Sequence, residues 1–133
     1  SGIALTVRHA AMTEDGGWDA MTRILGRGPR PTADRGPRPT ACGVGSLNQL
    51  FGVMAALRAA DVDVPGQMSV VSFDEDECLA FLEVPVTSVA MPLAELGGAA
   101  VDQLIARIER QPAGDVMIRE PMKLLTRRSV ARP

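Results

Sequence analysis

The chain has 133 residues, of which 46% are hydrophobic and 23% charged, and 16 acidic residues against 14 basic ones give a net charge of −2. Such a length and composition are typical of one globular domain or of part of one. The slight negative charge argues against a free-standing nucleic-acid-binding domain, which usually carries a clearly basic face. The apolar runs are well short of the ~20 residues that a membrane-spanning helix needs.

The first part of the chain is expected to form a strand followed by a helix. Residues 3–7 have the composition of a strand, and because Ser1-Gly2 leads directly into them, we expect the natural N-terminus to lie further upstream. Thr13 can cap a helix over residues 14–26, in which apolar side chains recur at helical spacing before glycines end it.

A second strand, over residues 40–44, is expected to lead into a second helix. Ser46 to Gln49 has the form of a capping box, in which side chains satisfy the free amides at a helix start. The helix then continues to about Ala60 and is apolar around much of its circumference, which indicates burial on two faces. One face should meet the sheet and the other a partner.

An exact tandem repeat precedes that strand. RGPRPTA occurs at residues 27–33 and again at 35–41. We interpret the repeat as a loop lengthened by duplication, in which only the second copy leads into the strand. Its four arginines leave a phosphate-binding loop as the alternative.

The most informative segment is VPGQMSVVSFDEDE at residues 64–77, where an apolar strand from Met68 to Phe73 stops at Asp74. In open α/β sheets, ligands bind in the crevice outside the carboxyl ends of the strands. Asp74 is therefore the first candidate for a functional residue, and its alternative role is to cap the turn that follows it. Glu75, beside it, is expected to face solvent or to support the loop.

The C-terminal part is expected to contain a strand at residues 87–91, a helix at 92–110, and two last strands at 116–119 and 123–126. Gly97 and Gly98 lie inside the helix and each costs up to ~1 kcal/mol against alanine, so we expect another backbone to approach there. Strands and helices alternate throughout, which predicts an α/β fold with a parallel sheet flanked by helices.

No nucleophile–base pair, metal-binding constellation or complete glycine-rich phosphate loop is apparent. We therefore expect no enzyme activity, no metal and no cofactor. The two cysteines, Cys42 and Cys78, are too few for a disulfide framework and are read as reduced thiols of a cytoplasmic protein.

Taken in order, these features resemble the effector-binding region of the lactose/galactose-repressor family of bacterial transcription regulators, which share the type I periplasmic-binding-protein fold. The matching features, which span nearly the whole chain, are Gly17-Trp18, Pro39-Thr40-Ala41, Gly52 with Ala56-Leu57, VPGQMSVVSFDE, Pro85 to Val89, Leu96-Gly97 with Ala100, and Arg128-Ser129.

The resemblance implies that the chain is the second half of that region and lacks the helix-turn-helix headpiece. Residues 1–88 and 121–133 would form the C-terminal subdomain, and residues 89–120 would belong to the missing N-terminal subdomain. The apolar stripe of helix 92–110 would then lack its native sheet. We expect it to pack elsewhere on its own subdomain or to be covered by another chain.

The resemblance also implies which residues line the effector cleft. Asp74 matches the acidic residue of the family, and its carboxylate would accept hydrogen bonds from an effector. Trp18 matches a position where some members stack an aromatic ring on the effector, and its alternative is a core residue. Ser46 stands where the family usually has Asn and is alternatively a helix cap. Met91 stands where a polar residue is frequent, so the effector can be a sugar, a nucleoside-like molecule or something less polar.

Two functions are compatible with the resemblance. The first is a small-molecule effector-binding and dimerisation fragment of a cytoplasmic DNA-binding transcription regulator, which would reach operator DNA only through its missing headpiece. The alternative is a periplasmic sugar-binding protein of a transport system, built on the same fold. A homodimer is expected in the first case, and its candidate interface residues are Phe51, Met54, Leu79, Phe81 and Leu82.

Overall fold

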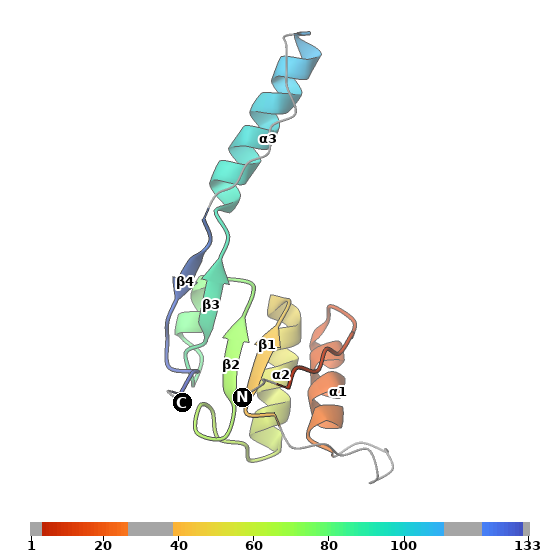
Figure 1. Ribbon diagram of the computed structural model, residues 1–133, viewed down its shortest axis with the longest axis vertical. Coiled ribbons are helices and arrows are strands. Elements are labelled where there is room, and N and C mark those ends of the chain that lie inside the picture. The colour runs from red at the N-terminus through yellow and green to blue at the C-terminus, as the bar shows by residue number, and fades with distance from the viewer. Residues whose placement is uncertain (1–3, 27–38, 111–120, 132–133) are drawn as a thin grey trace.

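The structure, a computed structural model, describes residues 4–26, 39–110 and 121–131 (Figure 1). Its elements alternate between helix and strand over most of the chain, as predicted. In chain order they are α1 (Glu14–Ile24), β1 (Ala41–Val44), α2 (Leu47–Ala59), β2 (Ser69–Ser72), the 3-10 helix η2 (Glu77–Ala80), β3 (Thr87–Ala90), α3 (Leu93–Ile108) and β4 (Lys123–Leu125).

The four strands form one sheet in the order β1-β2-β3-β4. The first three strands are parallel, whereas β4 is antiparallel to β3. The predicted α/β fold is thus confirmed, but a wholly parallel sheet was wrong for the last strand. The chain leaves β3 at its carboxyl end to enter α3 and comes back along the same side as β4, so β4 must run in the opposite direction (Figure 1).

The strand predicted at residues 3–7 is not formed over the residues that the structure describes there. Residues 4–9 are exposed and are assigned no regular structure. A strand needs a neighbour to complete its backbone hydrogen bonds, and no described strand lies in register with this segment. The Gln49 side-chain amide instead donates hydrogen bonds to the carbonyls of Ala10 and Ala11, at 3.1 and 2.9 Å, and thereby holds the segment against the start of α2.

Both predicted helix starts are confirmed by their caps. The Thr13 side chain accepts a hydrogen bond from the amide of Gly16 at 3.1 Å. The Ser46 hydroxyl likewise accepts one from the amide of Gln49 at 3.3 Å. Each bond satisfies a backbone amide that the helix itself leaves without a partner.

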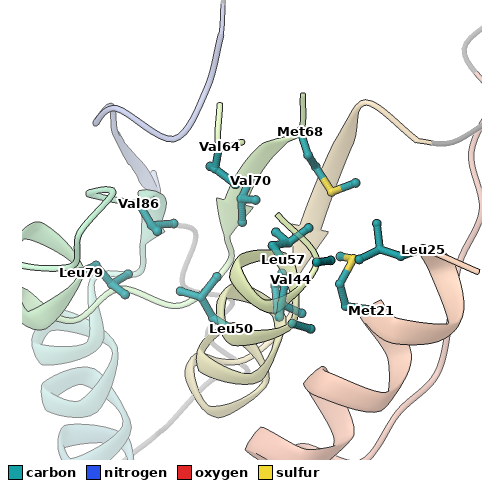
Figure 2. Close-up of a cluster of buried hydrophobic side chains, with 13 residues drawn as sticks. Met21, Leu25, Val44, Leu50, Leu57, Val64, Met68, Val70, Leu79 and Val86 are labelled. Carbon is teal, nitrogen blue, oxygen red and sulfur yellow. The ribbon is translucent and has the colours of Figure 1, made fainter. Parts of the chain in front are cut away.

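The core lies between the sheet and the pair formed by α1 and α2, and Figure 2 shows its side chains converging from both helices and from the strands. The helices approach closely because each contributes a glycine to the contact. A Cβ atom on Gly17 would lie 2.0 Å from the carbonyl oxygen of Gln49, and one on Gly52 would lie 1.9 Å from that of Glu14. The largest fully buried side chains of the core include Met21, Leu50, Leu57, Met68, Leu79, Val70 and Val86.

Helix α3 stands away from the sheet along the long axis of the molecule, and none of its residues is buried (Figure 1). Of the two expectations for its apolar stripe, packing on its own subdomain was therefore wrong, and cover by another chain stays a prediction. The expected close approach at Gly97 and Gly98 is also absent, because no atom in the described part of the chain lies within 4 Å of a Cβ built there. Its exposed large apolar side chains are Leu93, Val101, Leu104, Ile105 and Ile108.

Two predictions fall outside the described residues. These are the strand at 116–119 and the repeat, of which the structure describes only residues 39–41.

Candidate functional site

Asp74 lies two residues beyond the end of β2 and is half-buried. Its Oδ2 atom accepts a hydrogen bond from the backbone amide of Leu47, the first residue of α2, at 3.0 Å. The Ser72 hydroxyl fixes the backbone of Asp74, because it donates to the Asp74 carbonyl at 2.7 Å and accepts from the Asp74 amide at 3.2 Å. The structure therefore holds the Asp74 carboxylate just beyond the end of a strand, as the sequence predicted.

The alternative role predicted for Asp74, a cap of the turn that follows it, belongs to another residue. Asp76 caps η2 by accepting a hydrogen bond from the amide of Cys78 at 2.9 Å. Asp74 instead caps a helix that lies 27 residues earlier in the chain. A carboxylate at a helix N-terminus also interacts favourably with the partial positive charge there.

Ser46 and Asp74 both cap the start of α2, where Asp74 accepts from the Leu47 amide and Ser46 from the Gln49 amide. Ser46 is 5% exposed and its hydroxyl accepts the bond from Gln49, so its alternative role as a cap is the one observed. In the part of the chain that the structure describes, Oδ2 is the Asp74 carboxylate oxygen that accepts a hydrogen bond, and Oδ1 accepts none. One oxygen is thus held and the other can accept hydrogen bonds from a ligand.

Trp18 and Met91 are both about 40% exposed. Trp18 lies in α1, which begins near the carboxyl edge of the sheet, as does α2 (Figure 1). Met91 follows directly after β3. Neither side chain makes a hydrogen bond to Asp74 or Ser46 among the residues described. The structure thus brings Asp74 and Ser46 to the start of the same helix, whereas no hydrogen bond links Trp18 or Met91 to either of them among the described residues.

A second polar cluster, which the sequence analysis missed, lies beside Asp74 and consists of Glu75, Ser88 and Arg127; we call it the Glu75 cluster. The Arg127 guanidinium donates to both carboxylate oxygens of Glu75, at 2.7 Å from Nη2 to Oε1 and 3.0 Å from Nη1 to Oε2. The Ser88 hydroxyl donates to Oε2 as well. Glu75 is thus mostly shielded and paired rather than facing solvent, and its expected support of the loop stays a prediction.

The electrostatics of the Glu75 cluster follow from these bonds. The hydrogen bond from Arg127 is the main cause that holds the pKa of Glu75 below its ordinary value, and partial burial opposes it. The same contact raises the pKa of Arg127. Both groups are therefore ionised at neutral pH, and the pair is mostly shielded, since Arg127 and Glu75 side chains are 16% and 19% exposed.

An open hollow of about 590 Å³ lies between residues 8–11 and α1. Its lining includes Arg8, His9, Asp15 and Arg23 but none of the four predicted ligand residues. This hollow therefore does not include the surface around Asp74.

The predicted interface residues differ in exposure. Leu79 is fully buried in the core, so it is not available to a partner and its prediction was wrong. The 3-10 turn of η2 directs it inward, where it packs with the core cluster (Figure 2). Phe81, two residues later, is 85% exposed. Phe51, Met54 and Leu82 are half-buried.

The residues that the structure describes contain neither a metal-binding group nor a membrane-spanning helix. Those residues contain no group of three or more His, Cys, Asp or Glu side chains that could hold a metal ion. Within the same ranges, no helix combines the length and apolar character that crossing a membrane requires.

Comparison with known proteins identifies the family. Residues 2–130 match the model of the periplasmic binding protein-like domain. The chain is 35% identical over 94 residues to the ribose operon repressor of Escherichia coli K12, an alignment that covers 71% of this chain and 26% of the repressor. It is 30% identical to the HTH-type transcriptional regulator GalR of the same organism, over all of this chain and 37% of GalR.

A solved structure agrees with these relatives. The LacI family transcriptional regulator from Lactobacillus casei with bound sucrose superposes with a TM-score of 0.69 at 29% identity, covering 89% of this chain and 41% of that one. The chain therefore spans between about a quarter and two-fifths of the length of these proteins. All three are regulators or repressors, and none is a transport protein or an enzyme. The chain belongs to the periplasmic binding protein-like domain family, and the proteins to which it is similar are transcription regulators and repressors.

Proposed function

We propose that this chain is part of the small-molecule effector-binding region of a bacterial transcription regulator and that it binds a sugar or nucleoside-like effector at Asp74. The observation that carries the proposal is the position of this carboxylate at the end of a parallel strand, with one oxygen held by the Leu47 amide. Hydroxyl groups donate hydrogen bonds to a carboxylate, and such charge-assisted bonds are about twice as strong as neutral ones. The name of the ribose operon repressor and the sucrose in the Lactobacillus casei regulator support a sugar.

The remaining predicted ligand residues contribute in different ways. The exposed indole of Trp18 offers a flat apolar surface that suits a sugar ring or a base. Met91, at the carboxyl end of β3, adds an apolar wall. Ser46 acts indirectly, because its cap holds the start of α2 and with it the amide that binds Asp74.

We also propose that the site is completed by residues outside this chain. Residues 1–88 and 121–133 would form one subdomain, and residues 89–120 would belong to a second, which the greater length of the relatives would supply. The exposed apolar side chains of α3 support this division, because a stripe of this size is usually covered. Closure of the two subdomains on the effector would then alter binding to operator DNA by a headpiece outside the chain. This role would be exercised in the cytoplasm.

A homodimer would form through the surface made by Phe51, Met54, Phe81 and Leu82. Phe81 supports this proposal most directly, since 85% of it is exposed. Aromatic side chains are enriched among the residues that dominate binding at protein interfaces.

Calorimetric titration of the longer parent protein with ribose, sucrose and a nucleoside panel tests the proposed function. We expect D74N to weaken the binding of the preferred ligand at least ten-fold, because an amide lacks the charge that strengthens the hydrogen bonds. The matched control is D76N, which changes a neighbouring acid that caps η2. The proposal fails if no sugar or nucleoside binds, or if D74N binds as tightly as D76N.

A further inference from the structure

The Glu75 cluster joins three parts of the chain near the carboxyl end of β2, where Ser72 is paired with Ser88. Glu75 follows Asp74 in the loop after β2, Ser88 lies in β3, and Arg127 follows β4. Strand β3 leads into α3, and β4 brings the chain back from it (Figure 1). One carboxylate therefore connects the Asp74 loop to both strands that carry α3.

The bonds fix the cluster from several directions. Besides its two bonds to Glu75, the Arg127 guanidinium donates from Nη1 to the carbonyl of Val86 at 2.7 Å and to the hydroxyl of Ser88 at 2.8 Å. The backbone amide of Arg127 donates to the Thr87 hydroxyl at 2.9 Å. Ser88 itself is fully buried. A planar guanidinium held at both ends leaves Glu75 little freedom, since paired parallel bonds restrict distance and angle together.

The Asp74 loop is also held at its start, where the Phe73 amide donates to the Val44 carbonyl at 2.9 Å. Asp74 is held by the Ser72 hydroxyl on its own strand and by the Leu47 amide on α2. Phe73 is 55% exposed and Asp76 is exposed. Glu75 thus provides the side-chain anchor of this loop toward β3 and β4.

We propose that Glu75 and Arg127 are positioning residues, which hold the loop after β2 so that Asp74 keeps one oxygen on the Leu47 amide and leaves the other for a ligand. Through Ser88 and Arg127, the same bonds tie this geometry to the strands that set the direction of α3. The inference deepens the proposed function and rests on it only for the identity of what Asp74 binds.

Amide hydrogen exchange, followed by NMR on the 133-residue chain at neutral pH, tests the proposal without any effector. The reporter is the Leu47 amide, whose hydrogen bond to Asp74 is the geometry in question, and D74A sets the rate at which that bond is lost. We expect the Leu47 amide to exchange at least ten-fold faster in R127M and in E75Q than in the wild type. Amides of Val53 and Leu57 inside α2 should change less than three-fold, which separates a local effect from lower global stability.

The matched control is R128M. Arg128 is the next residue and donates from Nη2 to the carbonyl of Glu83 at 3.2 Å, a bond that involves no member of the Glu75 cluster. It should leave Leu47 exchange unchanged. The proposal is overturned if Leu47 exchanges at the wild-type rate in E75Q, if R128M accelerates it as much as R127M does, or if all the amides of α2 accelerate by the same factor. If R127M does not fold, the isosteric E75Q decides the question alone. Since no ligand takes part, this result stands apart from whether a sugar binds.

Discussion

The close contact between α1 and α2 predicts that the substitution G52A lowers the free energy of unfolding. A Cβ atom on Gly52 would lie 1.9 Å from the carbonyl oxygen of Glu14 and 2.6 Å from the amide nitrogen of Trp18. Both are backbone atoms, so neither can turn aside as a side-chain end would. G52A would therefore force α1 away from α2 by about an ångström or more, and the core contacts of Met21 and Leu25 would loosen with it.

Two terms of opposite sign decide the outcome. Alanine is favoured over glycine inside a helix by ~1 kcal/mol, whereas overpacking of this kind costs ~1–3 kcal/mol or more. Because the clash involves backbone atoms of a neighbouring helix, we expect the overpacking cost to exceed its usual range and reach about 3–5 kcal/mol. After the propensity gain is subtracted, the free energy of unfolding should fall by about 2–4 kcal/mol. With a denaturant slope of roughly 1.5–2 kcal/mol per molar urea, the midpoint should fall by about 1–3 M.

Urea denaturation, followed by the fluorescence of Trp18 and by circular dichroism, measures this change. The matched control is G97A in α3, where no described atom lies within 4 Å of the added Cβ. That substitution should increase helical circular dichroism, since only the helix-propensity gain of ~1 kcal/mol acts there. A G52A midpoint equal to that of the wild type would refute the reasoning that backbone contact, rather than propensity, determines the residue at this position.

Three further predictions concern buried bonds, pH and association. The hydroxyl of the fully buried Ser129 donates to the Val70 carbonyl at 2.6 Å and accepts from the Thr87 amide at 2.8 Å. S129A removes both bonds and should lower the free energy of unfolding by about 2–3 kcal/mol. A loss below ~0.5 kcal/mol in urea denaturation would contradict this prediction. The pKa of Glu75 is lowered in the folded protein, mainly by its hydrogen bond from Arg127; its stabilisation should be complete above the unfolded value of about 4.3 and disappear as pH falls through the folded pKa. E75Q should therefore reduce stability at neutral pH and flatten its acid dependence, and parallel pH profiles of the two proteins would argue against it. If the wild type sediments as a dimer, F81D should sediment as a monomer, because a charge replaces an 85% exposed apolar ring; an unchanged dimer would exclude Phe81 from the interface.

The sequence by itself determined most of the elements and the starts of α1 and α2. Helical spacing of apolar residues predicted α1, α2 and α3, and the caps at Thr13 and Ser46 are formed as expected. The apolar run before Asp74 predicted both β2 and the carboxylate at its end. These features depend on residues within a few positions of one another, so a local pattern is sufficient to recognise them.

Only the tertiary structure decided which distant segments meet. The direction of β4, the missing strand at residues 4–7 and the burial of Leu79 all depend on neighbours far away in the chain. Arg127 and Glu75 are 52 residues apart, and Leu47 and Asp74 are 27 apart. No short-range periodicity encodes such pairs, because their hydrogen bonds exist only after the sheet has brought the ends of its strands together.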